Sequence, residues 1–554
     1  MTMKITGLDV EFAALAAPLP IGFAQVNATQ WQAAAHAVRQ IGGRLLALWA
    51  SSAINNVAGG AGTARAEAIF CSYITAEGAF WLALPLQVTE GRTHSEPMGA
   101  TDSDASTGQR DALARCARYP DLSGLFPCAC RMQRCAADLS NVHAEGAPDT
   151  RPWFNHGAWA TDHYPLLQDP QALPEPAPGA LTDYPFVPMG GDGAHEIAVG
   201  PVHAGIIEPG HFRFSVVGER ILRLEQRLGY THKGIEQRMT QMPALQAYRL
   251  AGRVSGDTTV AYAWAYCMAL ESACQCTISP RATCLRALLL ERERVANHLG
   301  DLGAIANDVA FAFALAQFSR LREDWQRLSK AVFGHRFMMD CIVPGGVLAD
   351  IDPLQRDQML TQCDAIEGEV KGLFDIFEAH AGLQDRFMVT GRVTPALAAQ
   401  LGLTGLAGRA SQQAQDLRCD HPFGPYAELK VKRATQAQGD VGARVAVRFD
   451  EVLESLRLIR GILRELPVGA LQCEVTLPKQ PALGAGWVEG WRGEIFVALE
   501  LAGVEQGSRI LRCHLHDPSW QNWPVLEHSI MNDIVVDFPL INKSFNLSYS
   551  GQDL

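Results

Sequence analysis

A stretch rich in proline and glycine, at residues 169–193, constrains the fold of this 554-residue chain most strongly. Proline removes a backbone donor and glycine weakens helices and strands, so no continuous helix or central strand can run through it. Because 554 residues exceed what one hydrophobic core usually organises, we expect two domains joined here. The predicted units are a domain at residues 1–169, a linker at 170–193 and a larger domain at 194–554.

Composition excludes several classes of protein. With 48% apolar and 19% charged residues, the chain can bury large cores and is neither disordered nor fibrous. The net charge of −12 leaves no basic stripe for a nucleic-acid backbone. No run approaches the roughly 20 apolar residues of a spanning helix, so we expect membrane attachment only through partners. The first residues lack the pattern of a secretion signal, which predicts a protein inside the cell.

Hydrophobic periodicity predicts a small α+β domain before the linker. Residues 31–49 have helical spacing, whereas residues 68–75 and 79–88 resemble paired strands around a Glu77-Gly78 turn. Residues 89–109 are polar and rich in glycine, serine and threonine, which predicts a mobile loop.

The larger domain is predicted to combine a helix bundle with small sheets. Apolar residues recur at intervals of three and four from residue 245 to about residue 330, as they do on the helices of a bundle. Helical spacing returns at residues 352–380 and 447–466. Strand patterns flank the bundle at residues 196–202, at 212–224 with a Gly218-Glu219 turn, and from residue 490 onward. We therefore expect an α+β protein with a central helix bundle and flanking small β-sheets.

Several segments carry a family resemblance. In the larger domain they are GPVHAGIIEPGHFRF at 200–214, LGYTHKGIE at 228–236, RVSGDT at 253–258, NHLGDLG at 297–303 and SFNLSYSGQDL at 544–554. In this order they resemble the large subunit of membrane-bound, energy-converting nickel–iron hydrogenases and the homologous D subunit of NADH:quinone oxidoreductase, respiratory complex I. Before the linker, GAPDTRP at 146–152 and YPLLQD at 164–169 resemble the complex I C subunit. The resemblance implies a fused C-plus-D chain.

The chain departs from the hydrogenase pattern at the metal ligands. In that family two Cys-x-x-Cys pairs hold nickel and iron, because soft thiolates suit these metals. The matching positions here are Ser255 and Thr258 in one motif, and Ser548 and Gly551 in the last. Hydroxyls keep their protons at neutral pH and glycine has no side chain, so these residues cannot replace four thiolates. We expect no nickel–iron site and assign no metal ligand.

Complex I lacks the same cysteines, and the resemblance implies that the vacated cavity binds quinone. We expect His203, Ser255, Thr258 and Ser548 to line it. His203 is either a hydrogen-bond donor to a quinone carbonyl or a satisfied loop histidine.

The usual quinone ligands of complex I are not retained in place. Its tyrosine falls on Leu250, although Tyr248 is close, and its loop histidine falls near Pro209, although His203 and His211 are close. The loop instead follows the hydrogenase pattern.

Three charged residues are candidates for catalysis. Glu208 matches a carboxylate that passes protons to and from the metal cavity in hydrogenases, and a carboxyl beside a buried cavity can exchange protons near neutral pH. The alternative is a solvated loop glutamate. Arg253 forms either a charged wall of the cavity or a structural ion pair. Asp257, between two former ligand positions, is a candidate proton carrier.

Other polar clusters are interpreted as structural. His514 and His516 share one face of a strand, but no third metal ligand is evident. The cysteines grouped at residues 128–135 and 274–284 lack the spacing of a four-cysteine cluster, so we interpret them as ordinary thiols. The charged residues 291–294 predict a solvated or intersubunit helix face.

The sequence thus predicts the large subunit of a multisubunit, membrane-associated oxidoreductase that is inactive alone and passes electrons and protons to quinone. Electrons are expected from an iron–sulfur cluster on a partner small subunit. Membrane-arm subunits are expected to hold the chain, on the cytoplasmic side, at the inner face of the cell membrane. The donor, whether NAD(P)H, formate or another compound, is left open because its chemistry belongs to other subunits.

Two other hypotheses stay open. The chain is alternatively a degenerate structural subunit that docks the iron–sulfur protein to a membrane arm. A third hypothesis is a hydrogenase with unorthodox metal ligation.

Overall fold

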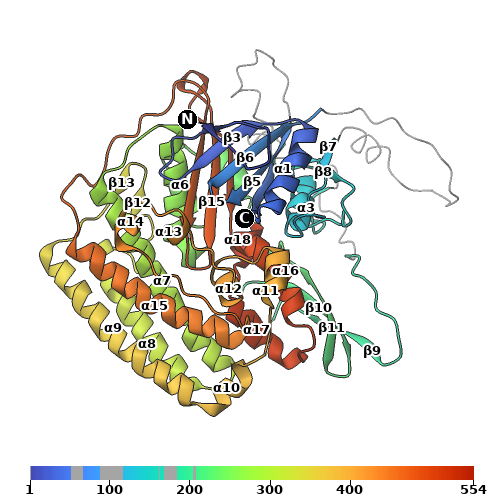
Figure 1. Ribbon diagram of the computed structural model, residues 1–554, viewed down its shortest axis with the longest axis vertical. Helices are drawn as coiled ribbons and strands as arrows, with labels where there is room; N and C mark the ends of the chain where they lie inside the picture. The colour runs from blue at the N-terminus through green and yellow to red at the C-terminus, as the bar shows by residue number, and fades with distance from the viewer. Residues whose placement is uncertain (1, 52–66, 88–115, 161–162, 168–183, 204–206) are drawn as a thin grey trace.

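The computed structural model describes residues 2–51, 67–87, 116–160, 163–167, 184–203 and 207–554 (Figure 1). Helices and several small sheets together confirm the predicted α+β class. The loop predicted at residues 89–109 and most of the linker predicted at residues 170–193 lie outside the described residues.

The first part of the chain forms a six-stranded sheet of order β1-β2-β3-β6-β5-β4, in which β3 and β6 are parallel. The strands are β1 Thr2–Met3, β2 Phe12–Ala14, β3 Ile21–Gln25, β4 Arg44–Ser51, β5 Ala68–Thr75 and β6 Gly78–Pro85. β5 and β6 form the predicted hairpin, but its turn is Ala76-Glu77, one residue earlier than predicted, with Thr75 opposite Gly78. Gly78 is required there because its φ is +137° and a Cβ would lie 2.2 Å from the Pro20 carbonyl oxygen.

The helix predicted over residues 31–49 is wrong in its second half. Helix α1 Ala28–Gln40 starts with a capping box at Asn27, and Gly42, with φ of +74°, follows its end. Strand β4 then begins at Arg44. Its residues are buried on both faces, so they lack the alternation that distinguishes a strand from a helix in the sequence.

Long helices form the central bundle, as predicted from the helical spacing, and Figure 1 shows α7, α8, α9 and α15 side by side. The helices are α6 Thr259–Ala273, α7 Pro280–Asp308, α8 Ala312–Phe333, α9 Pro353–Ala379 and α15 Val441–Arg464. The start of α7 is set locally: the Ser279 hydroxyl accepts a hydrogen bond from the Ala282 N–H, and Pro280 suits the first turn.

Two three-stranded sheets flank the bundle. One contains β9 Ala194–Val199, β10 His211–Val217 and β11 Arg220–Arg227; the other contains β14 Ala482–Glu489, β15 Glu494–Leu501 and β16 Ile510–His516. The Gly218-Glu219 turn joins β10 to β11, as predicted. Glycines let β14 approach α6 closely, since a Cβ on Gly486 would lie 1.9 Å from the Ala265 carbonyl oxygen.

The end of the chain is helical, and the strand pattern predicted from residue 490 onward is wrong after β16. Three helices follow: α16 Ser519–Ser529, α17 Phe538–Phe545 and α18 Tyr549–Asp553. These helices are too short to repeat a helical spacing over several turns of sequence.

Shorter elements connect these parts. They are β7 Ala117–Pro120, α3 Ala129–Ser140, β8 Val142–Glu145, α4 Ile235–Thr240, α5 Tyr248–Ala251, η2 Gly256–Thr258, β12 Ile342–Val343, β13 Gly346–Val347, α10 Ala381–Phe387, α11 Pro395–Leu401, α12 Gly405–Ala410, α13 Leu417–Asp420, α14 Pro425–Leu429, η3 Val504–Gln506 and η4 Val535–Asp537. Across the described ranges, no helix is both long and apolar enough to cross a membrane.

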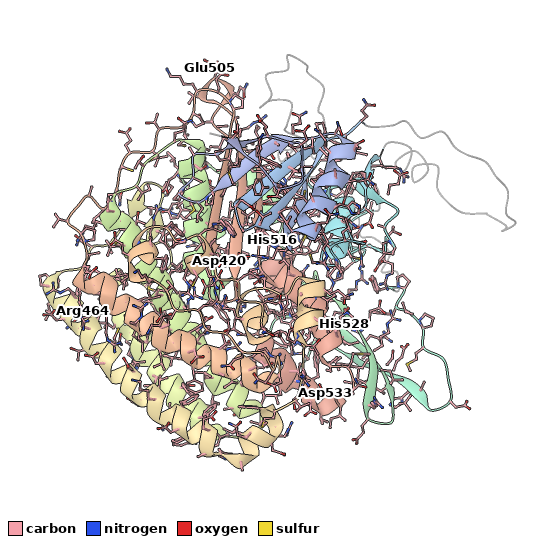
Figure 2. All side chains as sticks on the ribbon, in the orientation of Figure 1. Asp420, Arg464, Glu505, His516, His528 and Asp533 are labelled. Atoms are coloured by element: carbon pink, nitrogen blue, oxygen red, sulfur yellow. The ribbon has the colours of Figure 1, made fainter. Side chains whose placement is uncertain are left out.

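The N-terminal sheet packs on the strand β16. The Trp49 ring stacks on His514 with ring centroids 4.6 Å apart, and Arg512 Nε donates to the Ala50 carbonyl oxygen at 3.0 Å. Figure 2 places His516, on the same strand, in the interior beside the N-terminal sheet. The two parts of the chain therefore share one hydrophobic core.

The charged residues 291–294 of α7 are buried, which corrects the prediction of a solvated or intersubunit face. Several of their hydrogen-bond and ion-pair partners come from distant segments. Arg418 Nη1 lies 3.1 Å from Glu291, and Arg294 donates to the carbonyl oxygens of Glu489 and Gly490 at 2.7 and 2.9 Å. Arg409, also fully buried, donates to Glu451 and Glu489, both at 2.9 Å. These contacts form a buried ion network between α7, α12, α13, α15 and β14.

We predict that Arg409→Met destabilises the chain by ~3–5 kcal/mol, because the substitution removes the cation that the buried Glu451 and Glu489 side chains share. Urea denaturation followed by circular dichroism measures the change. The control is Arg320→Met, which removes an ion pair with Glu369 whose side chains are 46% and 45% exposed. This variant is expected to lose at most ~1 kcal/mol. Equal losses in the two variants would contradict a stabilising role for the network.

Candidate functional site

The structure brings together the four positions at which the resemblance places metal-binding cysteines. Ser255 precedes the 3-10 turn η2 and Thr258 ends it, while Ser548 is the N-cap of α18 and Gly551 lies in its first turn. The Ser548 hydroxyl donates to Ser255 Oγ at 3.3 Å and accepts from the Gly551 N–H at 2.8 Å. All four residues are buried.

Asp517 occupies the space beside Gly551. A Cβ at position 551 would lie 2.5 Å from Asp517 Oδ2 and 2.8 Å from Ser548 Oγ, so a side chain does not fit there without displacing Asp517. The Asp517 carboxylate accepts from the Tyr262 hydroxyl at 2.7 Å and from the Ser519 N–H at 2.8 Å. Hydroxyls, a glycine and a hydrogen-bonded carboxylate do not fit a nickel–iron centre, which needs thiolates.

An ion pair lies beside these positions. Arg492, in the turn between β14 and β15, donates to Asp257 through Nη1 at 2.9 Å and Nη2 at 2.6 Å. Ser255 and Thr258 also donate to Asp257, at 2.7 and 2.9 Å. Burial alone would raise the pKa of Asp257, but the Arg492 charge and these hydrogen bonds lower it to about 2. Asp257 is therefore a fixed anion at neutral pH.

Two other buried carboxyls titrate near neutral pH. Burial raises the pKa of Glu293 to about 8, although the Val260 and Ala261 N–H groups donate to it at 2.6 and 3.2 Å. Burial likewise raises the pKa of Asp553 to about 7 against hydrogen bonds from Thr231. Glu293 also lines a cavity of about 10 Å³, shared with Asp257, which is room for one water molecule.

Glu208 is joined to the end of the chain. Its Oε2 accepts from the Ser550 N–H at 3.0 Å, in the helix that carries Ser548. Lys233 Nζ donates to the Val254 carbonyl oxygen at 2.9 Å. Burial lowers the pKa of Lys233, while the nearby charges of Glu208 and Asp553 oppose that shift. Glu208, Asp553 and Lys233 thus form a second charged group next to the hydroxyls.

Arg253 makes a bidentate ion pair with Asp340, at 2.7 Å from each oxygen, and its side chain is 44% exposed. Among the described residues, none of its hydrogen bonds reaches Asp257. This geometry matches the structural alternative for Arg253. The Tyr248 ring is buried, and its hydroxyl accepts from Arg249 Nε at 3.2 Å.

The two loop histidines, His203 and His211, lie on either side of residues 204–206, which are outside the described ranges. His203 is half-buried. His211 Nδ1 lies 3.0 Å from the Gly200 carbonyl oxygen, and burial lowers the His211 pKa.

The strand histidines have hydrogen-bond partners. His514 Nδ1 lies 2.7 Å from Glu236, and His516 Nε2 lies 2.9 Å from Gln521. In the described part of the chain no group of three or more histidine, cysteine or acidic side chains is placed to hold a metal ion.

Sequence reasoning missed four residues of this site: Glu293, Arg492, Asp517 and Asp553. Asp553 lies inside the last motif, where its charge next to the end of the chain was a usable signal. Arg492 and Asp517 each follow a strand by a few residues, and strand ends are where polar site residues gather. Glu293 carried no such signal, because it lies among four consecutive charged residues.

Comparisons with known proteins agree with the resemblance. The family model described as "Respiratory-chain NADH dehydrogenase, 49 Kd subunit" matches residues 308–485. Hydrogenase-4 component G of Escherichia coli (strain K12) is 32% identical over 439 residues, which cover 78% of this chain and 76% of that protein. The C/D fusion protein of NADH-quinone oxidoreductase from Bacteroides thetaiotaomicron is 27% identical over 73% of this chain and 81% of its own length.

A solved structure shares the fold. One chain of the membrane-bound sulfane sulfur reductase, an archaeal respiratory membrane complex, is 24% identical with a TM-score of 0.61, covering 65% of this chain and 98% of that one. The predicted family and the fused C-plus-D type are confirmed. The chain belongs to the family of complex I-like and energy-converting hydrogenase subunits that includes hydrogenase-4 component G, formate hydrogenlyase subunit 5 and the C/D fusion proteins of NADH-quinone oxidoreductase.

Proposed function

We propose that this chain is the large subunit of a membrane-associated oxidoreductase complex, in which the former metal position exchanges protons during electron transfer. The observation that carries the proposal is the replacement of four thiolate positions by three hydrogen-bonded hydroxyls and a glycine. Ser548 donates to Ser255, and Ser255 donates to the permanently charged Asp257. Hydroxyls in line with carboxyls can pass protons, whereas they cannot hold nickel.

The carboxyls divide the roles. Asp257, held ionised by Arg492, supplies a fixed charge that orients the hydroxyls. Glu293 and Asp553, with pKa values of about 8 and about 7, take up and release protons at neutral pH. Glu208 connects the Asp553 end of the site to the loop that contains His203.

Quinone is the proposed electron acceptor. His203 and the hydroxyls of Ser255, Thr258 and Ser548 are the proposed contacts to its head group. The support is chemical: a two-electron, two-proton acceptor needs donors and titrating carboxyls, and both occur at this site. Arg253 is given no role in proton transfer, because its ion pair with Asp340 accounts for its position.

The partners follow from what the chain does not supply. The proposed electron source is an iron–sulfur cluster on a small subunit bound to this chain, and membrane-arm subunits hold the complex at the cytoplasmic face of the cell membrane. The proposed division of the chain is a C-subunit-like domain at residues 1–169, a linker at 170–193 and a D-subunit-like domain at 194–554.

A structural role is the second candidate, and one observation favours it. Asp517 fills the space beside Gly551, and Ser548 contacts Ser255 directly, so this part of the former cavity is occupied by protein atoms. A subunit that only docks an iron–sulfur protein needs no open cavity.

Glu208→Gln separates the two candidates. In the purified complex we expect quinone reduction to fall about 10²-fold while the subunits stay assembled, because the substitution removes a proton-transferring carboxyl. The control is Glu196→Gln, which removes a carboxylate paired with Arg213 on the edge strand β9. Unchanged turnover in Glu208→Gln would support the structural role. Nickel at one equivalent per chain would instead support a metal-dependent hydrogenase.

The pKa of Glu293 predicts a pH effect on stability. Its folded-state pKa of about 8 exceeds its ordinary value of 4.5. The stabilisation that this carboxyl gives is therefore complete below pH 4.5 and is lost as the pH rises through 8. We expect the Tm of the native chain to fall more steeply between pH 5 and pH 8 than that of Glu293→Gln, by differential scanning calorimetry.

The control for this measurement is Glu505→Gln. Figure 2 places Glu505 at the tip of the loop after β15, and its side chain is exposed. The Tm of Glu505→Gln should equal the Tm of the native chain at every pH. Parallel curves for the native chain and Glu293→Gln would show that Glu293 is already ionised in the folded state at neutral pH.

A further inference from the structure

Two cysteines that are 197 residues apart in the sequence meet at the end of α6. The Sγ atoms of Cys276 and Cys473 lie 3.2 Å apart. Cys276 follows α6 after a turn in which Gln275 has φ of +52°, and Cys473 lies in the segment between α15 and β14. This contact was not expected from the sequence, because Cys473 belongs to no cysteine cluster.

Backbone hydrogen bonds fix both partners of this thiol pair. The Cys276 N–H donates to the Glu271 carbonyl oxygen at 2.9 Å, and the Cys473 N–H donates to the Gly345 carbonyl oxygen at 3.0 Å. The Gly345 N–H in turn donates to the Glu271 side chain at 2.9 Å. The contact between the two sulfur atoms therefore results from the backbone fold and not from a chance orientation of two side chains.

Small molecules can reach the pair. Both cysteines are half-buried, and Cys276 lines a cavity of about 930 Å³ that is bordered by Trp264, Met268 and Phe423. A cavity of this volume admits a peptide as large as glutathione. By contrast Cys267, on α6, is fully buried.

We propose that Cys276 and Cys473 form an oxidisable dithiol, a redox modification site that closes to a disulfide by exchange with a low-molecular-weight disulfide such as oxidised glutathione. One cysteine, as its thiolate, attacks the external disulfide, forms a mixed disulfide and releases one glutathione thiol. The other cysteine then attacks the sulfur of the first cysteine. This step forms the disulfide between Cys276 and Cys473 and releases the second glutathione thiol. Two protein thiols are oxidised, and one external disulfide is reduced to two thiols.

The closing step needs little movement. A disulfide has an S–S bond of about 2.0 Å, so the sulfur atoms must approach by only about 1 Å from their present separation. The product would fasten residues 471–473, which pair with β13 through Gly346 and Gln472, to the end of α6. The external thiol that leaves last is released into the cavity that Cys276 lines.

Mass spectrometry of the full chain tests this site. The protein is incubated with oxidised glutathione, its remaining thiols are alkylated, and it is digested without reduction. We expect a peptide cross-linked through Cys276 and Cys473, and a loss of two of the chain's 14 thiols in a dithionitrobenzoate assay. Persistent glutathione on either cysteine, or no cross-link at these positions, overturns the proposal.

Single variants add a second readout. In Cys276→Ser or Cys473→Ser the remaining cysteine should keep its glutathione, because no neighbouring thiol displaces it. Cys284→Ser is the matched control, since Cys284 lines the same cavity, and it should form the cross-link as the native chain does. A variant that fails to fold leaves the native cross-link measurement decisive.

Discussion

The turn between β14 and β15 is held by buried arginines, and the candidate site depends on it. Arg294 of α7 donates to two carbonyl oxygens of the turn, at Glu489 and Gly490. Arg409 binds the Glu489 side chain. Two residues later the same turn presents Arg492 to Asp257. A loss of charge within the ion network would therefore move Arg492 as well as destabilise the bundle, because the backbone that carries Arg492 is the backbone that Arg294 holds.

One guanidinium serves two carboxylates at this site, and this imbalance sets their protonation. Arg492 touches Asp257 and lowers its pKa to about 2, whereas burial raises the pKa of Asp517 in spite of the same arginine. Four thiolates with a bound metal would have required another balance of charge. With hydroxyls in the place of the thiolates, the one guanidinium does not balance the charge of both carboxylates, and the second carboxyl is more readily protonated. This balance of charge is the physical basis of the proton exchange that we propose for the site.

The sequence predicted what local pattern and motif determine. The β5–β6 hairpin, the long helices and the grouping of Ser255, Thr258 and Ser548 follow from strand alternation, helical spacing and the motifs that carry the family resemblance. It failed where distant segments decide the outcome. The charged run of α7 is solvated by any local criterion, yet Arg418 and Glu451 arrive from more than 100 positions away to pair with it. The contact between Cys276 and Cys473 was invisible for the same reason.

The N-terminal sheet affects the site indirectly, because it helps to bury one carboxylate of the larger domain, Glu236. Glu236, in the motif at residues 228–236, binds Arg512 at 2.9 Å and His514 at 2.7 Å on β16. Burial would raise the pKa of Glu236, but these two partners lower it to about 2. The sheet excludes water from them by stacking Trp49 on His514. The Glu236 carboxylate therefore anchors the segment that carries Thr231 and Lys233. Because the N-terminal sheet completes the burial of this carboxylate, there is a physical reason for joining both parts in one polypeptide.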